Sequence, residues 1–281
     1  MNYPSSEVAE IASDEPIHER PILLLPGFTW DARANFGAMD SALQNLGYRT
    51  LAGHYYDSGD TPTRAFINGD EAKSRTEVMA TQVLDEIARQ GLENTPIDVV
   101  AFSYGSLIYD ALVRQFRELE LSAPSGNTNG RREAIFLAPS GTIDDETAPR
   151  LTVRYAAQLG SLAADAHFNR GIRAQARNPL KHPITRLREA AELGSRQVDY
   201  QHLSDIGINV HVIGYHSDSV FPHHRLQAGL EKQPHASYSE LAIGGAVHGS
   251  PLLHPYENAL AIDTILRSHD PNRVPTYWPE A

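Results

Sequence analysis

The chain has 281 residues, a length that allows one large domain or two small ones. Hydrophobic residues make up 41% of it, which is enough for a globular core and excludes a disordered or fibrous protein. The net charge of -11 argues against a general nucleic-acid binder, and the absence of cysteine excludes disulfides and thiolate nucleophiles.

The first segment, residues 1–18, is polar and acidic, and we interpret it as an N-terminal extension without a secretory signal. No run of 18 apolar residues occurs along the chain, so the sequence predicts no transmembrane segment. We therefore expect a cytoplasmic protein.

Short apolar runs of strand length alternate with amphipathic stretches of helical length along most of the chain. The runs predict strands at residues 21–25, 97–102, 134–137, 208–213 and 238–243. Because the first three are almost continuously apolar, we expect them to be covered on both faces by crossover helices. The pattern predicts an α/β fold with a mostly parallel central sheet and helices on both of its faces.

One helix has recognisable ends. Ser74 and Glu77 have the spacing of a capping box, apolar residues then recur every four positions as far as Ile87, and Gly91 is placed to end the helix. This helix would cross back to the strand at residues 97–102.

The segment at residues 100–106 carries the strongest chemical signal, since it places Ser103 at the junction of a strand and a helix. Ala101 and Gly105, two positions before and after it, are small enough for the strand and the helix to approach closely. The sharp turn would expose the Ser103 hydroxyl at the carboxyl end of the sheet, beside the backbone N–H groups of a helix N-terminus.

This segment, Ala101-Phe102-Ser103-Tyr104-Gly105, resembles the Gly-x-Ser-x-Gly elbow of the α/β-hydrolase superfamily, with alanine in place of the first glycine. The resemblance spans roughly residues 22–269 and favours the serine esterase or lipase-like branch that carries a lid. A strand, glycine, short loop, aspartate and proline at residues 208–222 match the family's acid loop, and residues 242–251 match its histidine loop.

The resemblance implies a catalytic triad of Ser103, Asp218 and His248, in the chain order of this family. Some relatives place the acid after an earlier strand, so Asp144 or Asp145 is an alternative. The resemblance also implies an oxyanion hole made by the backbone N–H groups of Phe28 and Tyr104.

Trp30 is a candidate for the substrate pocket, because it lies in the predicted oxyanion loop and flanks the predicted site. No metal and no cofactor is required by this chemistry. Among the other histidines we find no metal-ligating set that includes His211, His223, His224 or His254.

The interval between the strands at residues 134–137 and 208–213 is longer than one crossover needs. We predict a helical lid at residues 144–200, inserted into a hydrolase core formed by residues 19–143 and 201–281. From Glu146 to Val198 the insertion has nine basic and four acidic residues, a net charge of 9 - 4 = +5. These basic residues would either attract an anionic substrate or pair with the acidic core.

The function expected from the sequence is a serine hydrolase that cleaves a carboxylic ester of a small-molecule acyl substrate. Thioester, lactone and amide substrates stay open. Perhydrolysis or carbon-carbon bond hydrolysis by the same triad is an alternative, as is a non-catalytic ligand-binding protein of the same fold.

Overall fold

The computed structural model describes residues 20–27, 32–53, 74–118, 132–143, 149–150, 153–154, 193–243 and 247–269. The predicted N-terminal extension and most of the predicted lid lie outside these ranges, so the proposed division of the chain into core and lid stays a prediction.

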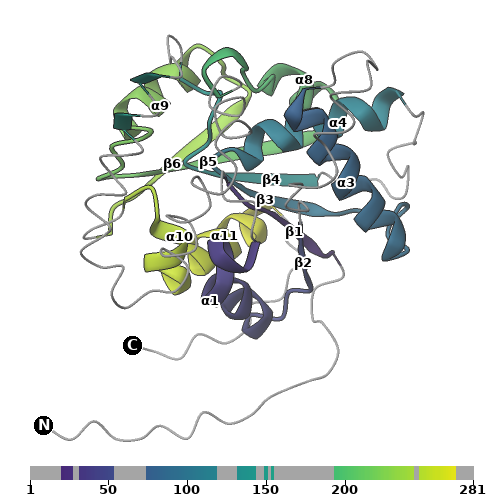
Figure 1. Ribbon diagram of the computed structural model, residues 1–281. Helices are drawn as coiled ribbons and strands as arrows, with labels where there is room; N and C mark the ends of the chain where they lie inside the picture. The colour runs from purple at the N-terminus through teal and green to yellow at the C-terminus, as the bar shows by residue number, and fades with distance from the viewer. Residues whose placement is uncertain are drawn as a thin grey trace, which may run out of the picture.

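The core is a sheet of six parallel strands in the order β2-β1-β3-β4-β5-β6 (Figure 1). The strands are β1 (Ile22–Leu25), β2 (Thr50–Ala52), β3 (Asp98–Phe102), β4 (Arg132–Leu137), β5 (Ile208–Tyr215) and β6 (Ala236–Leu241). Because β4 and β5 are direct neighbours, the segments before and after the predicted insertion belong to one sheet. The parallel sheet predicted from the sequence is confirmed.

The burial of each strand follows from its place in the sheet. All residues of β1 and β3 are buried, as expected for central strands covered on both faces. Asp98 is the polar exception in β3, and its carboxylate accepts the backbone N–H of Glu133 at 2.9 Å. The edge strand β6 is mostly polar and partly exposed, and it begins and ends two residues earlier than predicted because its pairing with β5 extends to Ala236.

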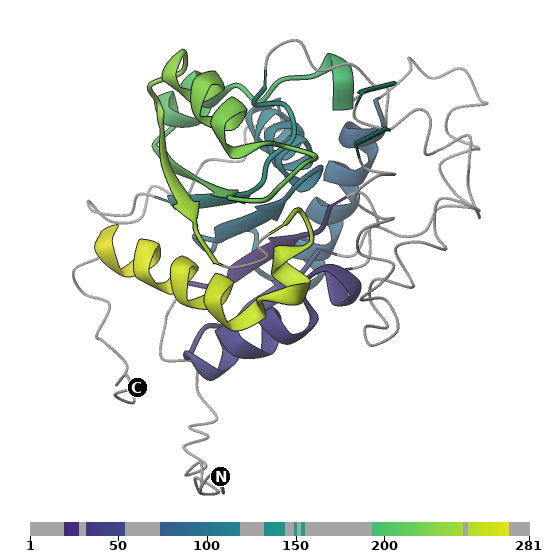
Figure 2. The same cartoon turned by 90° about the vertical axis from the view of Figure 1, so that its left-hand side faces the viewer.

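Helices cover both faces of the sheet (Figures 1 and 2). One core cluster joins the sheet to α3 (Arg75–Arg89), α4 (Gly105–Glu118) and α8 (Tyr200–Asp205). A second cluster joins the opposite face to α1 (Ala32–Asn45) and α11 (Pro255–His269), and α10 (Ser250–Leu253) contacts both of these helices. The helix α9 (His223–Glu231) packs beside β5 and β6.

The predicted ends of α3 are confirmed. The Ser74 hydroxyl accepts the backbone N–H of Glu77 at 3.3 Å, and the Glu77 carboxylate accepts the backbone N–H of Ser74 at 2.7 Å. The helix ends at Arg89, and the chain then passes through Gly91 with a φ of 66°, a conformation that glycine adopts without strain.

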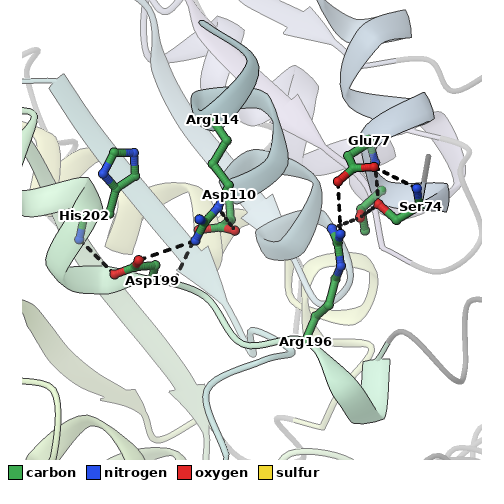
Figure 3. A network of polar contacts seen from close by, with 8 residues as sticks. Ser74, Glu77, Asp110, Arg114, Arg196, Asp199 and His202 are labelled. Atoms are coloured by element: carbon green, nitrogen blue, oxygen red, sulfur yellow. Dashed lines mark hydrogen bonds and ion pairs between the residues drawn. The ribbon is translucent and has the colours of Figure 1, made fainter. Parts of the chain in front are cut away.

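A polar network attaches the segment that re-enters the core, residues 196–199, to α3 and α4 (Figure 3). Arg196 forms an ion pair with Glu77 at 3.1 Å. Asp199 donates its backbone N–H to Asp110 at 3.1 Å, and Arg114 contacts the carboxylates of both aspartates. Arg196, one of the basic residues of the predicted lid, therefore pairs with the acidic core.

None of the helices in the described ranges is long and apolar enough to cross a membrane.

Candidate active site

Ser103 occupies a strained turn between β3 and α4. Its φ is 52°, in the left-handed region, where a residue other than glycine costs on the order of 1–3 kcal/mol. The turn brings the start of α4 against β1, since a Cβ atom added to Gly105 would lie 2.4 Å from the carbonyl oxygen of Leu25. Glycine at position 105 therefore has a steric reason, and the fully buried Ala101 fits its own position.

Two serines that the sequence analysis missed hold this turn. Both donate to the carbonyl oxygen of Ser103, Ser106 Oγ at 2.7 Å and Ser140 Oγ at 3.0 Å. The backbone N–H of Ser103 donates to the carbonyl of Leu137 at 2.9 Å. These bonds offset the cost of the strained backbone and fix the direction of the Ser103 side chain. The sequence offers one signal for this role, which is that Ser140 follows β4, the neighbour of β3.

The structure brings Ser103, His248 and Asp218 together at the carboxyl end of the sheet. His248 Nε2 lies 3.0 Å from Ser103 Oγ, and His248 Nδ1 lies 2.9 Å from Asp218 Oδ2. The Ser103 hydroxyl can donate to Nε2 while Nδ1–H donates to the carboxylate, and the second bond selects this imidazole tautomer. The arrangement can carry a proton from the serine to the histidine.

The Asp218 carboxylate is completely buried and has three donors. Its Oδ1 atom accepts the backbone N–H groups of Val220 at 2.7 Å and Phe221 at 3.0 Å, and its Oδ2 atom faces His248. These three contacts fix the orientation of the Asp218 carboxylate, with Oδ2 directed at the imidazole.

Aromatic rings enclose the imidazole. The ring centroids of Phe102 and Phe221 lie 5.0 Å and 5.2 Å from that of His248. Nearby, burial and the charge of Asp218 raise the pKa of Tyr215 well above its ordinary value, so this phenol stays neutral and donates to Asn258 at 2.7 Å. In such an environment, hydrogen bonds to a developing charge are stronger than in water.

The proposed oxyanion hole is only partly described. Tyr104 is fully buried directly before α4, which places its backbone N–H at the N-terminal end of that helix. Phe28 and Trp30 lie outside the described residues, as do Asp144 and Asp145. Their roles stay predictions.

Asn35, which the sequence analysis did not select, contacts the segment that precedes Phe28. This buried α1 side chain accepts the backbone N–H of Gly27 at 2.5 Å, through its Oδ1 atom. Asn35 therefore fixes the backbone at the point where the chain enters the predicted oxyanion loop.

A second group of potential ligand side chains occurs within the described part of the chain. His216, His223 and Glu240 could hold a metal ion, which corrects the expectation that His223 belongs to no such set. None of the three belongs to the Ser103 site. A cavity of about 830 Å³ between α3, α4 and residues 195–197 is also separate, because neither Ser103, Asp218 nor His248 lines it.

No protein-family model and no curated protein sequence matches this chain. Solved structures are similar over most of their length. A thermophilic esterase from Thermogutta terrifontis has 19% identity, with 89% of this chain and 90% of that chain covered and a TM-score of 0.59.

Two other solved structures give the same result. A bromoperoxidase from Bacillus anthracis has 14% identity, covers 89% of this chain and 92% of its own, and has a TM-score of 0.57. An esterase from Exiguobacterium antarcticum has 13% identity and a TM-score of 0.57, with 88% of this chain and 92% of that chain covered. At these identities the similarity is one of fold.

Proposed function

We propose that this chain, which has the α/β-hydrolase fold, is a serine hydrolase that cleaves a carboxylic ester through an acyl-enzyme on Ser103. The observation that carries the proposal is the unbroken chain of hydrogen bonds from Ser103 through His248 to Asp218. A protein that only binds a ligand does not need this arrangement, whereas a serine nucleophile requires an adjacent base.

The reaction begins when His248 Nε2 removes the hydroxyl proton of Ser103 and Oγ attacks the ester carbonyl. Asp218 stabilises the imidazolium that forms. The negative charge on the carbonyl oxygen is stabilised by the backbone N–H of Tyr104 and, by family resemblance, by that of Phe28. Loss of one such donor typically lowers kcat by about 10²–10³-fold.

The second half of the reaction uses the same groups. His248 gives its proton to the leaving alkoxide oxygen, and the acyl group stays bonded to Ser103 Oγ. His248 then takes a proton from a water molecule, whose oxygen attacks the acyl carbon. Cleavage of the bond to Oγ releases the carboxylic acid, and the proton returns to Ser103.

Perhydrolysis is a second candidate, favoured by the structural similarity to a bromoperoxidase. In that reaction hydrogen peroxide, rather than water, attacks the acyl-enzyme, so the product is a peracid and Ser103 is regenerated. Both reactions share the acyl-enzyme and differ only in the second nucleophile.

The test is hydrolysis of p-nitrophenyl acetate, butyrate and octanoate by the wild type, Ser103→Ala and Ser204→Ala. Ser204 is an exposed serine of α8 and serves as the matched control. We expect Ser103→Ala to lose at least about 10⁴-fold in kcat/KM on the best ester, and Ser204→Ala to stay within twofold of the wild type.

Activity that persists in Ser103→Ala would refute the assignment of the nucleophile. Peracid formation on addition of hydrogen peroxide, measured by bromide oxidation, decides between the two reactions. If no ester is turned over and no peracid forms, the proposal of a hydrolase is wrong.

A further inference from the structure

A three-residue cluster lies on the surface beside the loop that carries Asp218. His216 is in the turn after β5, His223 is the first residue of α9, and Glu240 is the second-last residue of β6. In the register of the sheet Glu240 pairs with Gly214, two residues before His216. One potential ligand atom from each side chain lies within 4.8 Å of the other two.

The two histidines face the two oxygens of one carboxylate. His216 Nδ1 is 2.5 Å from Glu240 Oε1, and His223 Nδ1 is 3.4 Å from Glu240 Oε2. The imidazole rings of the two histidines stack with centroids 5.2 Å apart and an angle of 27° between their planes. Both Nδ1 atoms therefore approach the same carboxylate.

His223 Nδ1 has no hydrogen-bond partner within the described residues, although this atom is buried. Its position facing Glu240 does not provide one, because the 3.4 Å contact lacks hydrogen-bond geometry. Buried polar atoms are normally satisfied, so an unpaired nitrogen that faces a carboxylate and a second imidazole indicates a ligand at this place.

We propose that His216, His223 and Glu240 bind a divalent transition-metal cation of the zinc class. Two neutral imidazoles and one carboxylate are a donor set that suits Zn²⁺, which also accepts a water molecule as a fourth ligand. A cation between the three side chains would use the free nitrogen of His223 and neutralise Glu240.

The present distances are close to those that zinc requires. Tetrahedral ligands with bonds of 2.0–2.1 Å lie about 3.3 Å apart, and the contact between His223 and Glu240 already has this length. His216 Nδ1 contacts the other carboxylate oxygen, Oε1, at 2.5 Å, and this hydrogen bond would have to open for His216 to bind the same cation. The His216 side chain is 62% exposed, so it can move and the cation can reach the site from solvent.

A bound cation would stabilise the loop that carries Asp218. Residues between His216 and His223 include Asp218 and its two backbone donors, and a bound cation would link both ends of this loop to β6. None of the three proposed ligands is Ser103, His248 or Asp218, so we expect a bound cation to stabilise the loop and the fold. The inference does not depend on the proposed hydrolase activity.

The experiment is a calorimetric titration of tag-free, EDTA-treated and dialysed protein with ZnCl₂. The variants are His223→Ala and Glu240→Gln, and the control is His224→Ala, an exposed neighbour whose ring lies edge-on to that of His223 outside the cluster. We expect the wild type and the control to bind one zinc ion that both variants fail to bind. Co²⁺ in place of Zn²⁺ should give a visible absorption band with the same pattern.

Thermal unfolding provides a second readout. With zinc at about 100 times its Kd, the Tm of the wild type and of His224→Ala should rise by about 5 °C, while that of His223→Ala should not rise. Circular dichroism without metal verifies that each variant is folded. Equal zinc stoichiometry in the wild type and His223→Ala would overturn the proposal, as would the absence of saturable binding to the wild type.

Discussion

Asp218→Asn removes the charge of the proposed acid with almost no change of shape. The wild-type carboxylate accepts two backbone N–H groups at Oδ1 and the His248 Nδ1–H at Oδ2. Asparagine has one carbonyl oxygen for these three donors. The orientation that places this oxygen at Oδ1 keeps two bonds and loses one, whereas the reverse orientation loses two.

The favoured orientation points the amide NH₂ group at His248 Nδ1. That nitrogen must then accept, so the proton of the neutral imidazole moves to Nε2. A protonated Nε2 cannot take the proton of Ser103, although it lies 3.0 Å from Oγ. A change of this kind in a serine triad lowers kcat by about 10⁴-fold, which corresponds to about 5.4 kcal/mol at 1.36 kcal/mol per factor of ten.

The assay is kcat/KM for p-nitrophenyl acetate at neutral pH, measured for the wild type, Asp218→Asn and Asp205→Asn. Asp205 is an exposed aspartate at the end of α8 and controls for loss of a charge. We expect a loss of about 10⁴-fold in Asp218→Asn and a change of less than twofold in the control. A loss below tenfold in a folded Asp218→Asn protein would refute the assignment of Asp218 as the acid.

Three other changes test the surroundings of the site. Asn35→Ala leaves the buried N–H of Gly27 without this acceptor, so urea denaturation should show about 1–3 kcal/mol less stability, and kcat should fall more than KM changes. Gly105→Ala places a methyl group 2.4 Å from a backbone carbonyl of β1, so thermal unfolding should show a loss of about 1–3 kcal/mol. Burial alone raises the pKa of Glu77, but hydrogen bonds from the helix N-cap and from Arg196 outweigh it and hold this pKa below the ordinary 4.5. The stabilisation is therefore present above pH 4.5 and lost as the pH falls through the lower folded-state pKa, so the stability of Glu77→Gln in urea should converge with that of the wild type in acid and not at neutral pH.

The sheet could be predicted from the sequence because its central strands are continuous apolar runs. The apolar run at residues 97–102 begins one residue before β3 and ends with it at Phe102. The small residue two positions after Ser103 reflects a steric requirement at Gly105. The edge strand β6 was placed two residues late, because its polar residues carry no apolar pattern and its limits depend on pairing with β5.

Contacts between separate elements of the fold could not be predicted in the same way. Ser140 reaches the carbonyl of Ser103 only because β3 and β4 are adjacent, and Asn35 reaches Gly27 only because α1 packs against β1. His216 and Glu240 are 24 residues apart and meet through the pairing of β5 with β6. No fixed spacing in the sequence marks any of these pairs.

Covalent labelling by a fluorophosphonate tests the central claim most directly, because this reagent reacts with an activated serine whatever the natural substrate is. The labelled wild-type protein would be digested and the modified peptide identified by mass spectrometry. We predict a single adduct on Ser103 that is absent from Ser103→Ala and retained in Ser204→Ala. Labelling of a different serine, or no labelling of the folded wild type, would contradict the account.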